Sequence, residues 1–273
     1  MSDESMTVSL VQAPVSKGDI SANLNMHLDA IAVSARHGAD VVVFPELSLT
    51  GYELSLAGEL TLDSRPEVIQ HLSEAAMRHQ VVVIAGGPLA AHGDHQAHYH
   101  GYRQEQRQAP RPYIGAIICS PCGAVENYAK QYLHQGEETF CAAGKRNITI
   151  VHKGYTLALA ICADFSNPAH AADAAANGAD LYLASALISE AGYAADAQIL
   201  SSIARKHQFP VLLANHCCET GGWSACGRSG MWDQYGEQVA AAKGTTPGMV
   251  LCTLKGDALS GTMVCFADAP LAL

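Results

Sequence analysis

The sequence predicts an α/β fold in which two β-sheets pack face to face and helices cover the outer side of each sheet. The chain has 273 residues, 49% of them hydrophobic, which is enough to enclose a large core. Its strand-like segments are short and continuously apolar, the pattern of strands buried on both faces. A helix–strand–helix–strand unit also occurs twice, and we expect the two copies to form two related layers.

The repeat rests on two pairs of similar segments. The stretch "RHGADVVVFPELSLTG" at 36–51 resembles "ANGADLYLASALISEAG" at 176–192, since each has a Gly-Ala-Asp turn before an apolar strand. The stretch "AAMRHQVVVIAGG" at 75–87 resembles "SIARKHQFPVLLANH" at 202–216, since each has a helix end, a His-Gln turn and another strand. No linker rich in Pro, Gly or Ser separates the copies, so we interpret residues 1–273 as one domain.

Helices are expected in both halves. Over 21–37 the apolar residues that share one face are Leu24, Leu28, Ile31, Ala32 and Ala35. The helix over 64–79 has Pro66 in its first turn, and Ser64 with Glu67 predicts a capping box. The counterparts in the second half are expected over 168–178 and 194–207.

The expected strands are the apolar runs 41–45, 81–85, 157–161, 181–185 and 211–215. The least regular region, 88–111, is predicted to be an exposed loop or an irregular hairpin connection.

Composition excludes several function classes. The net charge is −10 and no basic stripe is present, which disfavours nucleic-acid and anionic-membrane binding. No apolar run approaches the roughly 20 residues that cross a bilayer. The start of the chain, "MSDESMTVSL", lacks a signal-peptide pattern, and the nine cysteines are an odd number. We therefore expect a cytoplasmic protein with reduced thiols.

Reactive side chains follow apolar strands in three segments. Glu46 lies in "VVVFPELSLTGY", Lys130 and Glu137 lie seven residues apart in "ENYAKQYLHQGEETFCAAG", and Cys162 ends the run "LALAIC". Each residue alone has an ordinary explanation, as a surface charge or a packed thiol. Together, a thiol, a base and a cation at successive loop entries are what thiol-dependent acyl transfer requires.

These three segments resemble the signature regions of the carbon–nitrogen hydrolase (nitrilase) superfamily, in the same order. The resemblance covers nearly the whole chain and extends to "GRSGMWDQYGEQVA" near the end. It implies a four-layer αββα sandwich with an internal pseudo-two-fold repeat, a chain that dimerises, and no metal or organic cofactor. It also implies that Cys162 is the nucleophile and Glu46 the base, with Lys130 and Glu137 beside them.

The implied reaction is hydrolysis of a small-molecule amide through a cysteine thioester. Lys130 and the backbone N–H of Ala163 are expected to hold the oxyanion, with Lys130 favouring the thiolate of Cys162. Hydrolysis of a nitrile or of an N-carbamoyl group remains an alternative, and so does a non-catalytic or a metal- or redox-binding protein. For the metal alternative, Cys119 and Cys122 form a single Cys-x-x-Cys pair, and His92, His95, His98 and His100 crowd one loop.

The residues near the cysteine indicate which substrate fits. Many family members have a bulky residue directly after the nucleophile and a glutamate after the next proline, whereas this chain has Ala163 and Ala169. The expected substrate-binding residues are Tyr52, Ala163, Asp164 and Phe165, with Trp223 as a further apolar wall. No basic residue precedes His170 after the cysteine, so a neutral amide is expected in preference to an acidic one. Arg228 is the residue that would contradict this by reaching the pocket.

Overall fold

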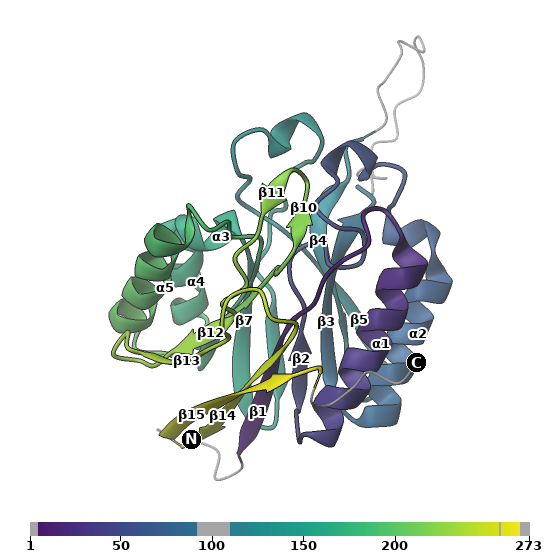
Figure 1. Ribbon diagram of the computed structural model, residues 1–273. Helices are drawn as coiled ribbons and strands as arrows, with labels where there is room; N and C mark the ends of the chain where they lie inside the picture. The colour runs from purple at the N-terminus through teal and green to yellow at the C-terminus, as the bar shows by residue number, and fades with distance from the viewer. Residues whose placement is uncertain (1–4, 92–109, 257, 268–273) are drawn as a thin grey trace, which may run out of the picture.

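Two β-sheets pack against each other in the computed structural model, which describes residues 5–91, 110–256 and 258–267 (Figure 1). The first sheet has the strand order β15 (Ala258–Cys265), β14 (Gly248–Lys255), β1 (Met6–Gln12), β2 (Val41–Val43), β3 (Val82–Leu89), β4 (Tyr113–Cys119) and β5 (Val125–Ala129). The second has the order β13 (Gln238–Ala241), β12 (Gly230–Trp232), β9 (Val211–Asn215), β8 (Leu181–Ala186), β7 (Tyr155–Ile161) and β6 (Thr149–His152).

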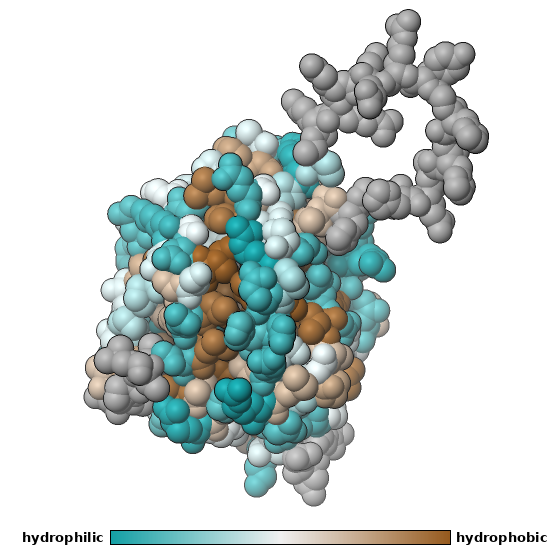
Figure 2. Space-filling view, turned by 90° about the vertical axis from the view of Figure 1, so that its right-hand side faces the viewer, coloured by the Kyte–Doolittle hydropathy of each residue, from teal (hydrophilic) through white to brown (hydrophobic). Residues whose placement is uncertain are grey.

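Helices form the two outer layers. They are α1 (Ile20–Arg36) and α2 (Pro66–His79) on the first sheet, and α4 (Pro168–Ala176) and α5 (Tyr193–His207) on the second. Figure 2 shows the side of α1 and α2, where hydrophilic side chains cover much of the surface around a strip of apolar ones. The predicted αββα sandwich is therefore confirmed. Among the described residues, no helix is both long and apolar enough to cross a bilayer.

Shorter elements complete the chain. They are the one-turn helices η1 (Leu54–Leu56), η2 (Leu62–Ser64) and η3 (Glu137–Thr139), the short helix α3 (Ala163–Ser166), and the hairpin of β10 (Glu219–Thr220) with β11 (Trp223–Ser224).

The two sheets share one internal arrangement. In the first, β1, β2 and β3 run parallel, with antiparallel β14 and β4 on either side. In the second, β7, β8 and β9 run parallel, with antiparallel β6 and β12 on either side. The internal repeat of the sequence thus corresponds to two sheets with the same strand directions.

The repeated turns have the same hydrogen bonds in both halves. In the Gly-Ala-Asp turns, the Asp40 carboxylate accepts from the N–H of Thr7, and the Asp180 carboxylate accepts from the N–H of Thr156. In the His-Gln turns, Gln80 and Gln208 both adopt a left-handed conformation that ends a helix. Each turn therefore sets where the following parallel strand begins.

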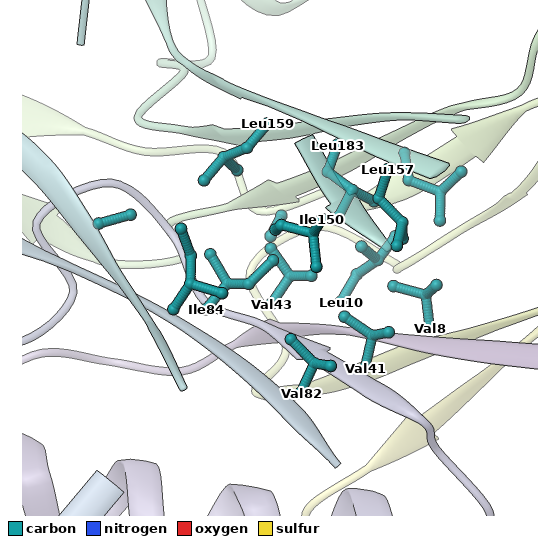
Figure 3. Close-up of a cluster of buried hydrophobic side chains, with 14 of the residues drawn as sticks. Val8, Leu10, Val41, Val43, Val82, Ile84, Ile150, Leu157, Leu159 and Leu183 are labelled. Carbon is teal, nitrogen blue, oxygen red and sulfur yellow. The ribbon is translucent and has the colours of Figure 1, made fainter. Parts of the chain in front are cut away.

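Both faces of the central strands are buried, which explains their continuous apolar sequence. Val41 and Val43 of β2 point into the core between the sheets, toward residues such as Leu157 and Leu183 (Figure 3). Val42, between them, belongs to the core under α1 and α2. Alternate side chains thus serve two different cores, so neither face of the strand can be polar.

One local prediction was wrong. The capping box does not form, because Pro66 is the first residue of α2 and Arg65 is its N-cap, so Ser64 lies one residue too early and bonds to the carbonyl of Thr61. The expected hairpin connection over 88–111 agrees with the structure, in which β3 continues to Leu89, β4 begins at Tyr113 and the two strands pair antiparallel. The four histidines of this region lie outside the described residues.

The buried face of α1 also contains polar residues that the apolar pattern did not indicate. His27 bonds to the carbonyl of Asn23 and to the hydroxyl of Ser48, and the Asn23 amide donates to the carbonyl of Leu49. Burial lowers the pKa of His27 to about 4, so the ring is neutral at ordinary pH. These bonds attach α1 to the loop that follows Glu46.

Gly86 of β3 gives a test of how closely this loop packs. A Cβ atom there would lie 2.5 Å from the backbone nitrogen of Leu47 and 2.6 Å from the carbonyl oxygen of Pro45. We expect Gly86→Ala to lower the free energy of unfolding by about 1–3 kcal/mol, because backbone must move to admit the methyl group. Gly58→Ala is the control, since nothing lies within 4 Å of its Cβ position. Urea unfolding measures both, and equal stability of the two variants would contradict the prediction.

Candidate active site

Glu46, Lys130 and Cys162 come together from three strands of the two sheets. Glu46 follows β2, Lys130 directly follows β5, and Cys162 directly follows β7. Two bonds join the sheets at this point: the Ser185 hydroxyl of β8 donates to the carbonyl of Phe44, and His216 Nε2 bonds to the carbonyl of Glu46 at 2.6 Å. The carboxyl ends of parallel strands from both sheets therefore meet at one site.

A buried cation lies between two buried carboxylates. Lys130 Nζ is 2.7 Å from Glu46 Oε1 and 2.6 Å from Glu137 Oε1, and all three side chains are at most 1% exposed. Glu137 also accepts hydrogen bonds from the hydroxyl of Tyr52 and, at 2.7 Å, from the N–H of His134. Buried charges need such partners, so each group of this network depends on the others for its place.

The electrostatics of this network determine the protonation states. Burial raises the pKa of Glu46 to about 7, although Lys130 acts in the opposite direction. Burial alone would lower the pKa of Lys130, but the charges of Glu46, Cys162 and Glu137 outweigh it and raise the pKa. Lys130 is therefore an ammonium ion, and Glu46 exchanges a proton near neutral pH.

The thiol of Cys162 is neutral in the resting site. Burial raises its pKa well above the ordinary value and Glu46 raises it further, whereas Lys130 lowers it. As predicted, Lys130 favours the thiolate by lowering the pKa of Cys162, but burial raises this pKa by more. Glu46 Oε2 is buried and accepts no hydrogen bond of ordinary geometry from the described residues. This oxygen is consequently available to take a proton.

Cys162 has a strained backbone. Its φ is 44° and its ψ is −108°, and it is the N-cap of α3. A non-glycine residue rarely adopts a positive φ, and such strain occurs mainly where surrounding contacts enforce it. Here the N–H of Cys162 donates to the carbonyl of Ser185 at 2.9 Å. The chain therefore turns sharply at the end of β7 and leaves the sulfur at the edge of the sheet.

Asp164 holds this turn against the loop of Lys130. Its carboxylate accepts hydrogen bonds from the N–H groups of Ile161, Gln131 and Tyr132, each at 2.9 Å, and from the Tyr128 hydroxyl at 2.6 Å. Behind Tyr128, His170 bonds to the hydroxyls of Tyr128 and Tyr182. The sequence suggested substrate binding for Asp164, but the structure buries the residue and directs its carboxylate to these internal donors.

Beside Cys162 lies a cavity of about 390 Å³. Among the predicted residues, Tyr52, Ala163, Phe165 and Trp223 line it, and Asp164 does not. The remaining lining residues are His134, Ser166, Leu187, Ile188, Ser189, Gly192, Ala195 and Asp196. Leu187 and Ile188 follow β8, so the rule that sites form at strand ends could have indicated them. No sequence signal pointed to Asp196.

Arg228 does not reach this cavity. Its guanidinium is 2.7 Å from Glu190 and lies over the ring of Tyr193. A second cavity of about 230 Å³, next to Tyr155, Phe209 and Leu254, contains none of the predicted site residues.

For a metal, the described residues offer no group of three or more His, Cys, Asp and Glu side chains with suitable geometry. Cys119 ends β4 and is buried, whereas Cys122 is exposed in the following turn.

Comparisons with known proteins find a matching family and similar chains. The family described as Carbon-nitrogen hydrolase matches residues 7–260. An (R)-stereoselective amidase of Pseudomonas sp is 28% identical over 65% of this chain, and a formamidase of Pseudomonas syringae is 27% identical over 81%. The matched parts span only 59% and 61% of these two relatives.

Among solved structures, a cysteine-to-alanine mutant of the amidase from Nesterenkonia sp. AN1, in complex with butyramide, has a TM-score of 0.80 at 23% identity. The match covers 94% of this chain and 92% of that one. This likeness concerns the fold.

Asp164 can be tested as the residue that holds the cysteine turn. We expect Asp164→Asn to lower the free energy of unfolding by about 2–4 kcal/mol, because an amide group cannot replace a carboxylate that accepts from donors on both oxygens. Asp173→Asn, an exposed carboxylate on α4, is the matched control. Urea unfolding compares the two variants. An Asp164 variant as stable as the Asp173 variant would show that the hydrogen bonds do not hold the turn.

Proposed function

The chain belongs to the carbon–nitrogen hydrolase family, and we propose that it hydrolyses the amide bond of a small molecule through a thioester on Cys162. The observation that carries this proposal is the buried Lys130 between Glu46 and Glu137, directly behind a cavity that opens at a cysteine. Two relatives are named an amidase and a formamidase, and a structural neighbour binds butyramide, which supports an amide rather than a nitrile.

The first half of the reaction forms the thioester. The Cys162 sulfur adds to the amide carbon as its proton moves to Glu46 Oε2, so no free thiolate is needed in the buried site. The oxygen of the tetrahedral intermediate is held by Lys130, which has a third N–H beyond the two directed at the carboxylates, and by the backbone N–H of Ala163. Glu46 then protonates the nitrogen, the carbon–nitrogen bond breaks, and ammonia or an amine leaves.

The second half releases the acid. A water molecule in the place of the departed amine gives its proton to Glu46 and adds to the thioester carbon. The carbon–sulfur bond then breaks, and Glu46 returns the proton to the sulfur. Glu137 keeps Lys130 in position throughout, since it is bonded to Tyr52 and to the backbone of His134 as well as to the ammonium group.

The pocket supports a substrate that is not anionic. Its described lining contains the carboxylate of Asp196 but no lysine or arginine side chain, and Arg228 is engaged by Glu190 outside it. A negatively charged substrate group would find no lysine or arginine partner among these lining residues. This supports a neutral amide over the amide of a dicarboxylic acid or an N-carbamoyl amino acid.

An ammonia-release assay over amides, nitriles and N-carbamoyl compounds tests the proposal. We expect wild-type protein to release ammonia from short neutral amides such as butyramide, and Cys162→Ala to fold normally and lose turnover by several orders of magnitude, because the nucleophile is absent. Intact-mass analysis after rapid quenching should find an acyl adduct on Cys162. Cys122→Ala, at an exposed thiol, is the control. Turnover that survives in Cys162→Ala, or activity confined to nitriles, would contradict the proposal.

The raised pKa of Glu46 predicts a pH dependence. Because Glu46 must be ionised to accept the thiol proton, kcat/KM should fall as the pH falls through about 7. The charge of Glu137 raises this pKa, so Glu137→Gln should move the acidic limb of the profile to lower pH while also reducing the rate. Glu138→Gln, at the exposed neighbour, should leave the limb in place. A limb that stays or moves upward in Glu137→Gln would contradict the assignment of this limb to Glu46.

A further inference from the structure

We propose that Asp196 is a specificity-determining residue, whose carboxylate binds a positively charged group on the part of the substrate that is remote from the reacting amide. This proposal rests on the proposed amidase function and adds to it a preference, among amides, for those that also carry an ammonium group.

Asp196 shares the cavity of the nucleophile. It lies in the first turn of α5 and lines the same space of about 390 Å³ as Cys162. Most of the other walls are apolar or aromatic, among them Phe165, Leu187 and Trp223. A single acidic side chain in such a pocket orients a ligand by charge, while the apolar walls hold its carbon chain.

The Asp196 carboxylate has no close cationic partner within the described part of the chain. It accepts no hydrogen bond and forms no ion pair there, and His134 acts on it only through a longer electrostatic interaction. Burial raises its pKa, which means that its charge has lost part of its hydration. A ligand cation would restore the missing interaction. Arg228 lies outside the cavity, where it is paired with Glu190 and lies over the ring of Tyr193.

A structural explanation for Asp196 also exists. An acidic residue in the first turn of a helix interacts favourably with the helix dipole, typically by 0.3–1 kcal/mol. That role would change stability when the charge is removed, but it would not make catalysis depend on the charge of the substrate. The two roles therefore differ in a measurable way.

The test compares substrates of equal length and different charge. Ammonia release is measured for 5-aminopentanamide and for hexanamide, which replaces the ammonium group by a methyl group. We expect wild-type kcat/KM to be higher for the amino amide by roughly tenfold, the size of one hydrogen bond to a charged group. Asp196→Asn should remove this preference, so that kcat/KM becomes similar for the two amides. Asp173→Asn, which removes an exposed carboxylate of α4 outside the cavity, should retain the preference.

A binding measurement separates this proposal from the amidase proposal. Calorimetric titration of Cys162→Ala with both amides needs no turnover, and it should show tighter binding of 5-aminopentanamide that is lost in Cys162→Ala with Asp196→Asn. If no amide is hydrolysed but this charge-dependent binding is present, the amidase proposal fails and the cation site stands. Equal binding and equal turnover of the two amides, or a preference that persists in Asp196→Asn, would overturn the role of Asp196.

Discussion

The ion pairs that Lys130 makes with Glu46 and Glu137 are the interaction on which the rest of the site depends. Each of the three charges is buried, and a buried charge without a partner costs several kcal/mol. Because Glu46 follows β2 and Lys130 follows β5, the pairs hold together loops that are far apart in the sequence. The fold supplies the supports: Gly86 leaves room for the Glu46 turn, and His216 bonds to its backbone from the other sheet.

Burial raises the pKa of both Glu46 and Cys162, the two groups that share a proton in the proposed reaction. It raises the pKa of Glu46 to about 7, which makes this carboxylate a far better base than a solvated one. It also favours the neutral thiol of Cys162. The strained turn at Cys162 places the sulfur in the cavity, and Asp164 maintains that turn by accepting hydrogen bonds from both loops.

In the proposed reaction, the reacting groups and the groups that contact the rest of the substrate lie in different surroundings. Glu46, Lys130 and Glu137 are buried, whereas Tyr52, Trp223 and Asp196 line the cavity. This division is general in enzymes, because reacting groups need a preorganised, dry environment and recognition groups need access. The expected dimer and the expected cytoplasmic location stay predictions, because the structure of a single chain tests neither.

The sequence by itself determined the local elements and the order of the reactive residues. Gly-Ala-Asp and His-Gln turns act through bonds to near neighbours, and apolar runs reflect burial on both faces, so both can be recognised without coordinates. Only the tertiary structure decided where side chains point after a strand ends. Asp164 turns inward to the N–H groups of the Lys130 loop, and Asp196 lines the cavity because α5 packs beside α3. Arg228 stays outside because Glu190 and Tyr193 hold it. Such directions depend on contacts between distant segments, which no local pattern encodes.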